Sequence, residues 1–239
     1  MRILDISLAD PADNILLDDA LWVNAEKNDG GEVLRFWESP TVFVVLGRIG
    51  KEKEDLQIQP VLNDRIPVLR RTSGGGTVLQ GPGCINYSLI LNKNRHRLLH
   101  DLRASYEWIS GHVIEALSVQ GCQAVFRPIS DIALHGQERK FSGNAQRRGK
   151  NFILHHGTIL YQFDLSLIER YLKMPKDIPD YRRQRDHRDF IVNIPINPQQ
   201  FKRDMAGLFA KTAWQTSLTP HEMVLLENQK AKFPFRIDI

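Results

Sequence analysis

The sequence predicts an α+β fold with mixed β-sheets packed against helices, and three observations support this class. Short segments of apolar or alternating residues, each bounded by turn residues, predict strands at 33–37, 41–47, 124–127, 131–134 and 153–163. Apolar residues spaced three and four apart predict an amphipathic helix over 101–120, which Gly121 ends. Strands and helices do not alternate regularly, so we expect one α+β domain over residues 1–239.

Capping signals place the remaining helices. Asp10-Pro11 predicts a helix start, and Gly30-Gly31 follows the expected end of that helix. Asn197-Pro198 predicts a second start, and Thr219-Pro220-His221-Glu222 has the residues of a capping box. The segment 181–189 is polar, basic and without periodicity, so we expect an exposed loop there.

Composition excludes several classes of function. The 239 residues are 42% hydrophobic and 25% charged, with a net charge of +4. This excess suits an acidic or phosphate-bearing partner but is too small to indicate nucleic-acid binding. The longest apolar run, 42–46, is far too short to cross a membrane. With only Cys84 and Cys122, no disulfide framework is expected, and we predict a cytoplasmic protein.

One glycine-rich stretch dominates the chain and reads Arg70-Arg71-Thr72-Ser73-Gly74-Gly75-Gly76-Thr77. Strand-like residues before it and after it predict a strand, a wide loop and a returning strand. Glycines expose main-chain N–H groups, and arginine binds carboxylate or phosphate in a bidentate manner, so we expect an anion site. The alternative, a mobile turn with solvated arginines, explains three adjacent glycines less well.

The common nucleotide-binding motifs do not account for this stretch. No Gly-Lys-Ser/Thr follows it, and a strand rather than a helix comes next. The chain also lacks His-Glu-x-x-His and Gly-x-Ser-x-Gly.

Lys140 is a second candidate, beside the small residues 142–145. A lysine there could neutralise charge on a carboxylate or phosphate oxygen. By itself, however, an exposed hairpin lysine explains it better. In the strand 153–163, His155 and His156 point to opposite faces, so one of them faces inward. A structural histidine is at least as good an explanation for that residue as a catalytic one.

Taken together, these motifs resemble one known family. The glycine-rich stretch is followed by Asn86-Tyr87-Ser88, by Arg139-Lys140-Phe141-Ser142-Gly143-Asn144-Ala145-Gln146, and by His155-His156-Gly157-Thr158. In this order they resemble the lipoate–protein ligase A family, whose superfamily includes biotin ligases and octanoyltransferases. The resemblance covers most of the chain and implies a catalytic domain of the biotin/lipoate ligase type.

The resemblance also implies an activity and its participants. Lipoate and ATP-Mg²⁺ would form lipoyl-adenylate, and a lysine of a lipoyl-carrier domain, either an E2 subunit or a glycine-cleavage H-like protein, would then receive the lipoyl group. Lys140 would be the catalytic residue, contacting the acyl carbonyl and the phosphate. Asp131 would contact the nucleotide or its Mg²⁺. The remaining residues implied in substrate and adenylate binding are Arg70, Arg71, Ser73, Gly74, Gly75, Gly76, Thr77, Asn86, Ser142, Gly143, Ala145, His156 and Gly157.

The sequence departs from the family pattern at three places. Cys84 and Ser130 stand where the family commonly has asparagine. The chain ends at Ile239, without the C-terminal accessory domain of full-length ligases, so we expect adenylation to involve a separate small accessory subunit.

Two alternatives stay open. The chain could move octanoyl or lipoyl groups through a cysteine thioester without ATP, with Cys84 or Cys122 as nucleophile. The cysteine-dependent relatives place theirs where this chain has Val125, which favours the ligase. The chain could instead be a non-catalytic module that binds a lipoyl carrier, but the intact lysine and glycines argue against it. The basic segment 182–188 could dock an acidic carrier or could simply be solvated.

Overall fold

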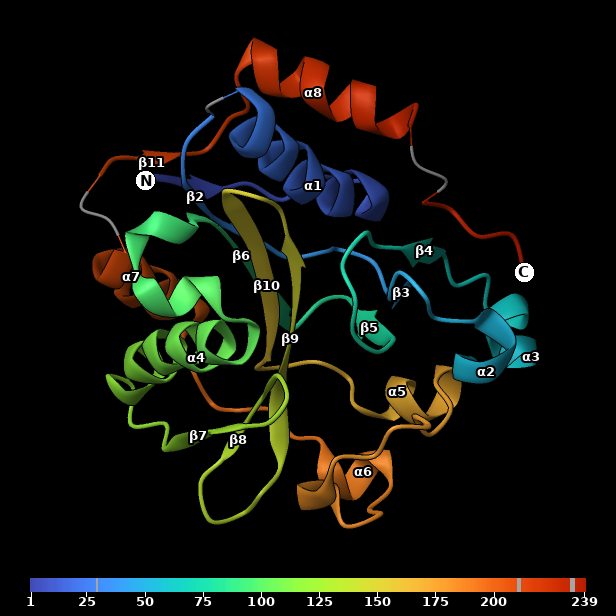
Figure 1. The fold of residues 1–239 in the computed structure, drawn as a ribbon. Coiled ribbons are helices and arrows are strands. Elements are labelled where there is room, and N and C mark those ends of the chain that lie inside the picture. Colours follow the sequence, from blue (N-terminus) through green and yellow to red (C-terminus); the bar gives the residue numbers. More distant parts are fainter. Residues whose placement is uncertain (29, 210–211, 233–234) are drawn as a thin grey trace.

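Two β-sheets form the framework of the computed structural model, which describes residues 1–28, 30–209, 212–232 and 235–239. Over these residues the larger sheet has eight strands and the smaller has three (Figure 1). Parallel and antiparallel pairs occur in both sheets. The predicted class, mixed sheets packed with helices, is therefore confirmed.

The larger sheet has the strand order β11-β1-β2-β6-β10-β9-β8-β7. β1 lies parallel to β11 and to β2, and every later pair from β2 to β7 is antiparallel. Its long central strands carry the residues of the candidate site. The bounds are β1 Arg2–Asp5, β2 Val33–Trp37, β6 Cys84–Asn92, β7 Ala124–Arg127, β8 Asp131–Leu134, β9 Lys140–Arg148, β10 Phe152–Leu160 and β11 Trp214–Gln215.

The smaller sheet has the order β4-β3-β5, and the glycine-rich loop connects its two outer strands. Short helices α2, α3 and α5 lie beside it (Figure 1). Here the bounds are β3 Phe43–Leu46, β4 Val68–Arg70, β5 Val78–Gln80, α2 Glu52–Asp55, α3 Ile58–Asn63 and α5 Ser166–Tyr171.

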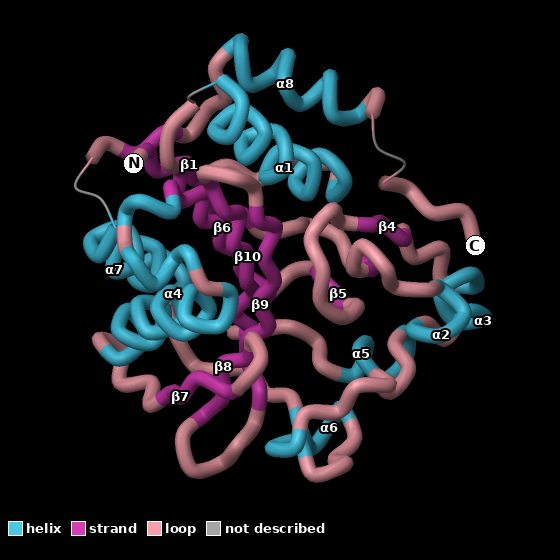
Figure 2. The backbone as a smooth tube through the Cα atoms, in the orientation of Figure 1, coloured by secondary structure: helices cyan, strands magenta, loops and turns pink. Residues whose placement is uncertain are grey.

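Longer helices cover the two faces of the larger sheet (Figure 2). α4 (Leu102–Ser118) and α7 (Pro198–Phe209) pack on one face, while α1 (Pro11–Asn28) lies on the other and is covered by α8 (Pro220–Lys230). α6 (His187–Phe190) follows a 3₁₀ turn, Asp180–Arg182. Among the described helices, none has the length and apolarity needed to cross a membrane.

Alternation along β10 shows how the two faces are used. Ile153 and Ile159 belong to the apolar cluster with α4 and α7, whereas Leu154 packs with α1 and Leu160 packs with the smaller sheet. His156 lies between Leu154 and Leu160 on this second face. The gap between α1 and the smaller sheet is where the glycine-rich loop meets the larger sheet.

A buried ion pair attaches α1 to this face. Arg35 is fully buried and donates to Asp18 Oδ1 at 2.6 Å and to the Asn14 side chain at 2.7 Å. The other Asp18 oxygen accepts from Ser88 Oγ at 2.5 Å and from the indole of Trp37 at 3.3 Å. Because both charges are paired and hydrogen-bonded, removal of either one would leave an uncompensated buried charge.

The predicted helix boundaries agree well with the structure. The periodic segment 101–120 forms α4, capped by Asp101 accepting from the Ala104 N–H, and Gly121 follows it at φ +78°. The capping box at Thr219 is present at the start of α8. Local capping chemistry therefore sets these boundaries.

Two predictions require correction. The chain does not return from the glycine-rich loop as one strand, because it forms β5 in the smaller sheet before it enters the larger sheet as β6. The segment 181–189 is not simply an exposed loop, since Arg182 is only 3% exposed and its guanidinium lies 4.5 Å from the ring of Phe190. Tertiary packing, which local polarity does not report, orders this segment.

Candidate active site

The glycine-rich loop is built around the buried guanidinium of Arg71. Arg71 NH2 donates to the carbonyls of Gly74 and Gly76, both at 2.7 Å, and Nε donates to Ser73 Oγ at 3.0 Å. Burial lowers the pKa of Arg71 to about 10, so the side chain stays charged at neutral pH. These contacts turn the loop carbonyls inward. Arg71 therefore shapes the loop.

The main-chain amides of the loop are left free by this arrangement. Within the described ranges of the chain, the N–H groups of Gly74, Gly75 and Gly76 have no hydrogen-bond acceptor. Gly75 and Gly76 are exposed. Because successive unpaired N–H groups in a loop are suited to bind an anion, these three amides are a candidate anion-binding site.

Two glycines are needed for the close packing of this loop. Gly75 has φ +87°, and a Cβ there would lie 3.0 Å from Arg71 NH2. A Cβ on Gly47, in the neighbouring loop, would lie 2.0 Å from the Gly75 carbonyl oxygen. The second contact was not predicted, because no local pattern links residue 47 to residue 75.

Ser73 connects the loop to the larger sheet. Its Oγ lies 2.7 Å from Nε2 of His156, and it also accepts from Arg71. Burial, with the nearby Arg71 charge, lowers the pKa of His156 to about 3. The imidazole is therefore neutral at physiological pH, and the loop keeps a single positive charge at this point.

Arg70 and Thr77 anchor the two ends of the loop. Arg70 NH1 donates to the carbonyls of Gly50 at 2.7 Å and Gly47 at 3.1 Å, and its NH2 lies 2.5 Å from Glu52. Thr77 Oγ1 donates to Asp55 at 2.5 Å. Both side chains thus hold the loop against 47–55. A direct contact from Arg70 to a ligand anion stays a prediction.

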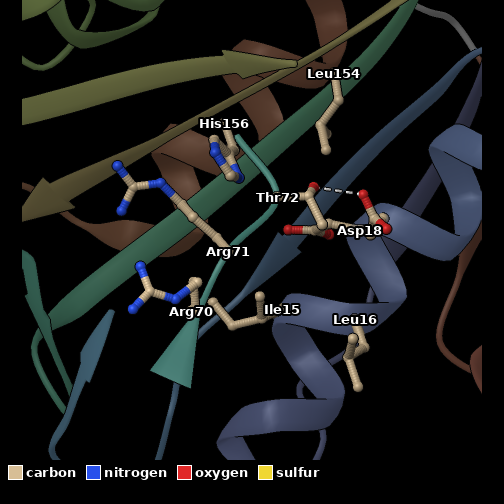
Figure 3. A pocket seen from close by; sticks show the side chains of 9 residues that line it. Ile15, Leu16, Asp18, Arg70, Arg71, Thr72, Leu154 and His156 are labelled. Carbon is tan, nitrogen blue, oxygen red and sulfur yellow. Dashed lines mark hydrogen bonds between the residues drawn. The ribbon is translucent and has the colours of Figure 1, made fainter. Parts of the chain in front are cut away.

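A small pocket lies between this loop, α1 and β10 (Figure 3). Ile15 and Leu16 of α1 line it together with Leu154 of β10, and Arg71 and His156 border it. At its other side, Thr72 donates to Asp19 at 2.6 Å. With a volume of about 10 Å³, this pocket has room for about one water molecule, so it does not hold an acyl chain as it stands.

Lys140 reaches the same face because of a β-bulge at the start of β9. Ile132 of β8 pairs with Ser142, but the next residue, Ala133, pairs with Lys140, so Phe141 is an extra residue. Without the bulge, alternation would place Lys140 and Gly143 on opposite faces. With it, the ammonium lies over Gly143, where a Cβ would be 3.2 Å from Nζ.

Asp131 and Tyr181 hold the lysine in this position. Lys140 Nζ lies 2.8 Å from Asp131 Oδ1, and the Tyr181 hydroxyl donates to Asp131 Oδ2 at 2.7 Å. Burial, and then the Asp131 charge, raises the pKa of Tyr181, so the phenol keeps its proton. Sequence analysis missed Tyr181, because it lies within a polar segment that has no pattern.

The carboxylate of Asp131 fits a magnesium ion poorly in this arrangement. Each of its oxygens already has a partner, and the described residues contain no group of three or more His, Cys, Asp or Glu that could hold a metal. The predicted Mg²⁺ therefore stays a prediction, and the chemistry proposed below uses only groups of the chain.

The loop and the lysine meet along one face of β9. A Cβ on Gly75 would lie 3.5 Å from Cβ of Ala145, while the Lys140 ammonium lies over Gly143. Residues 143 and 145 point to the same face and are roughly 7 Å apart along a strand. A carboxylate or phosphate group between them would be within reach of both. The predicted convergence of these two distant segments is thus present in the geometry.

Three predicted residues have other surroundings. Gly157 and Ser142 lie on the opposite face, toward α4, where a Cβ on Gly157 would be 2.0 Å from Asn144 Oδ1 and 2.5 Å from the Tyr87 hydroxyl. Asn86 is on the loop face but is 4% exposed and donates to the Cys84 carbonyl at 3.3 Å. Gly157 therefore does not face the glycine-rich loop, and its place near the acyl chain stays a prediction.

His155 is the inward-facing histidine. It is fully buried, with Nδ1 3.0 Å from Gln146 Nε2 and Nε2 3.1 Å from Asn144 Oδ1. Burial and the neighbouring His156 lower its pKa to about 3. The neutral ring of His155 accepts a hydrogen bond from the Gln146 amide and donates one to the Asn144 amide oxygen, as expected for a structural histidine.

Neither cysteine is activated as a nucleophile. Cys84 is 1% exposed, and burial raises its pKa well above the ordinary range. Burial also raises the pKa of Cys122, which packs against the cluster on the α4 face. A thioester mechanism requires a thiolate, which both environments disfavour.

These features define a class of protein: an α+β domain in which the main-chain amides of a glycine-rich loop and one lysine lie on a common face of the larger sheet. The comparisons identify which family of that class is present. The profile of the family described as "Lipoyl protein ligase A/B catalytic domain" matches residues 10–206, and the chain belongs to this family.

Curated relatives carry two names. A probable lipoate-protein ligase A of Mycoplasma pneumoniae is 31% identical over 166 residues, which cover 70% of this chain and 47% of the relative. An octanoyltransferase LipM of Geobacillus kaustophilus is 27% identical over 81% of this chain and 77% of the relative. The chain thus spans about half the length of the ligases that it matches first.

Solved structures share the fold. A bi-partite lipoate protein ligase of Thermoplasma acidophilum, described with its E2 lipoyl domain, superposes with a TM-score of 0.82 at 20% identity, covering 97% of this chain and 92% of the other. A lipoate-protein ligase A bound with ATP has a TM-score of 0.80 at 21% identity, with 97% and 94% covered.

Proposed function

We propose that this chain is the catalytic unit of an ATP-dependent lipoate–protein ligase. The observation that carries the proposal is the pair of anion-binding elements on one face of β9: the free amides of Gly74, Gly75 and Gly76, and the ammonium of Lys140. Membership of the lipoyl ligase family and the likeness to an ATP-bound ligase support it.

The proposed first step activates the fatty acid. A carboxylate oxygen of lipoate attacks the α-phosphorus of ATP, the bond to the bridging oxygen breaks, and pyrophosphate leaves. Negative charge gathers at the carboxylate and phosphate oxygens, and fixed donors in a dry site stabilise it strongly. Lys140 and the loop amides would supply these donors.

The second step transfers the acyl group. The uncharged ε-amine of a carrier lysine attacks the carbonyl carbon of lipoyl-adenylate, AMP leaves, and the amine loses a proton. No nucleophile of this chain takes part, in agreement with its two buried or half-buried thiols. The contribution of the protein is positioning and charge neutralisation.

We infer two partners. The carrier would be a lipoyl domain, such as an E2 subunit or a glycine-cleavage H-like protein, and the likeness to the Thermoplasma ligase studied with an E2 lipoyl domain supports this. A separate small accessory subunit would assist adenylation, which the description of that ligase as bi-partite supports. Residues 1–239 would act as one catalytic domain in this assembly.

Two assays of the purified chain test the proposal. The first measures pyrophosphate release with lipoate and ATP, and the second measures by mass spectrometry the transfer from chemically prepared lipoyl-adenylate to a lipoyl domain. Release and transfer together support a self-sufficient ligase. Transfer without release supports the need for an accessory subunit. The absence of both would overturn the proposal.

The octanoyltransferase relatives make acyl transfer through a cysteine the second candidate. The buried environments of Cys84 and Cys122 argue against it. A Cys84→Ala, Cys122→Ala double variant that keeps transfer from lipoyl-adenylate would exclude the thioester route. ATP-independent transfer from an octanoylated carrier, lost in this variant, would establish it.

A further inference from the structure

Tyr181 makes the third member of a hydrogen-bonded chain that ends at the ammonium of Lys140. Its hydroxyl donates to Asp131 Oδ2 at 2.7 Å, and the other oxygen of the same carboxylate lies 2.8 Å from Lys140 Nζ. Asp131 is 8% exposed, so water competes little for these bonds. The carboxylate is therefore held at both oxygens.

Tyr181 is itself fixed by its neighbours. Its ring lies 5.2 Å from the ring of Phe190, and Arg185 NH2 donates to the carbonyls of Tyr181 at 2.9 Å and Glu138 at 2.7 Å. The second of these bonds attaches the segment to the turn just before β9. The segment that carries the Tyr181 hydroxyl is thus attached beside the start of the strand that carries Lys140.

Lysine requires such a support more than arginine does. Its side chain has four rotatable bonds and a single charged atom, and Lys140 begins its strand beside a β-bulge. An aspartate bound only to the lysine could rotate and carry the ammonium with it. A second bond on the other oxygen removes this freedom.

We propose that Tyr181 is a positioning residue that acts through Asp131 to hold the Lys140 ammonium over Gly143. This inference rests on the proposed function for its catalytic consequence, but its structural part does not. Tyr181→Phe keeps the ring on Phe190 and removes only the hydroxyl.

The first test needs no substrate. The rate of Lys140 acetylation by acetic anhydride is measured by peptide mass spectrometry in the full chain. Tyr181→Phe should change this rate by about fivefold, because Asp131 loses its second bond while it still holds Lys140, and acetylation of Lys173 should stay unchanged. An unchanged rate at Lys140 would overturn the inference.

A matched control is available elsewhere in the chain. Tyr171 donates to Asp64 at 2.8 Å, and the same Asp64 oxygen lies 2.7 Å from Arg170 Nε, so this trio also joins a tyrosine, an aspartate and a cation. Tyr171→Phe should leave acetylation of Lys140 and pyrophosphate release unchanged. Equal effects of the two variants would show a general loss of structure instead.

The second test is kinetic and asks whether Tyr181 acts through Asp131. Tyr181→Phe should lower kcat for pyrophosphate release about tenfold with little change in the KM for lipoate. In an Asp131→Asn background the same change should have no further effect. An unchanged tenfold loss in that background would contradict the inference. If wild type releases no pyrophosphate and transfers no lipoyl group, the proposed function fails, while the acetylation result still decides the positioning role.

Discussion

The two halves of the candidate site use their positive charges differently. At the loop, Arg71 is 6% exposed and its guanidinium is occupied by carbonyls of the loop that it supports. At the start of β9, the side chain of Lys140 is 28% exposed and is held through one carboxylate. The arginine is part of the scaffold, whereas the lysine can exchange its partner for a ligand.

This difference separates the two kinds of donor that would face an anion. On the loop side the donors would be main-chain amides, and that of Gly75 cannot turn away because Arg71 fixes the Gly74 carbonyl of the same peptide. On the other side the donor is one side chain, which Asp131 and Tyr181 support. Substitutions at the two ends should therefore fail in different ways, mainly by loss of loop structure or mainly by loss of catalysis.

The largest effect is expected for Lys140→Ala. Removal of a fixed donor to a developing oxyanion lowers the rate by about 10²–10³-fold, so pyrophosphate release should fall by this factor. The free energy of unfolding should also fall, because the buried Asp131 then keeps only the Tyr181 hydroxyl as a partner. Lys173→Ala, which removes a lysine that donates to the Lys53 carbonyl at 2.7 Å, serves as the control. Retention of full activity in Lys140→Ala would show that the ammonium is not a donor in the reaction.

Arg71→Lys should affect stability and activity together. Lysine cannot reach the carbonyls of Gly74 and Gly76 and Ser73 Oγ at once, so buried acceptors lose their donors at a cost of about 1–3 kcal/mol. We expect a lower melting temperature and a loss of activity of about tenfold or more. Arg95→Lys, at a pair with Glu32 on the surface, should show neither effect. An active, fully stable Arg71→Lys variant would show that the guanidinium does not shape the loop.

Acid should weaken the loop side through His156. Its pKa is about 3 in the folded chain and about 6.5 when unfolded, so below pH 6.5 the unfolded chain binds a proton that the folded chain does not. The free energy of unfolding should therefore fall as the pH drops from 6.5 toward 3, by up to roughly 2 kcal/mol by pH 5. Denaturant titrations of wild type and His156→Gln at pH 7 and pH 5 measure this, and equal pH dependence of the two proteins would contradict it.

The smallest effect is expected for Gly143→Ala. The added Cβ would lie 3.2 Å from Cε and Nζ of Lys140, so the ammonium must shift by a few tenths of an ångström. We expect kcat to fall by about threefold to tenfold without loss of stability. Gly111→Ala, in α4 with no atom within 4 Å of the new Cβ, should leave kcat unchanged. Equal kcat values for Gly143→Ala and wild type would show that the lysine has more freedom than the structure indicates.

Local signals predicted those parts of the fold that local chemistry decides. The periodicity of 101–120, the cap at Thr219 and the opposite orientation of His155 and His156 are all fixed by neighbours along the chain. The motifs around Arg71 and Lys140 predicted the two halves of the candidate site, because each motif is also a short continuous stretch of the chain. Each motif keeps its residues together in sequence.

The features that the sequence did not predict depend on contacts between segments that are distant along the chain. A bulge is set by the pairing of β9 with β8, so the sequence around Phe141 does not report it. The contact of Gly47 with Gly75 and that of Tyr181 with Asp131 join segments from different parts of the chain. The close approach of Gly157 to Asn144 and Tyr87 likewise joins three different strands, so its own motif does not report it.

A crystal structure of the chain with a non-hydrolysable analogue of lipoyl-adenylate would test the central claim most directly. We expect the acyl–phosphate linkage of the analogue to lie between β9 and the glycine-rich loop, with Lys140 Nζ and at least one amide of residues 74–76 within hydrogen-bond distance of its oxygens. An analogue bound with its phosphate away from either group would contradict the account.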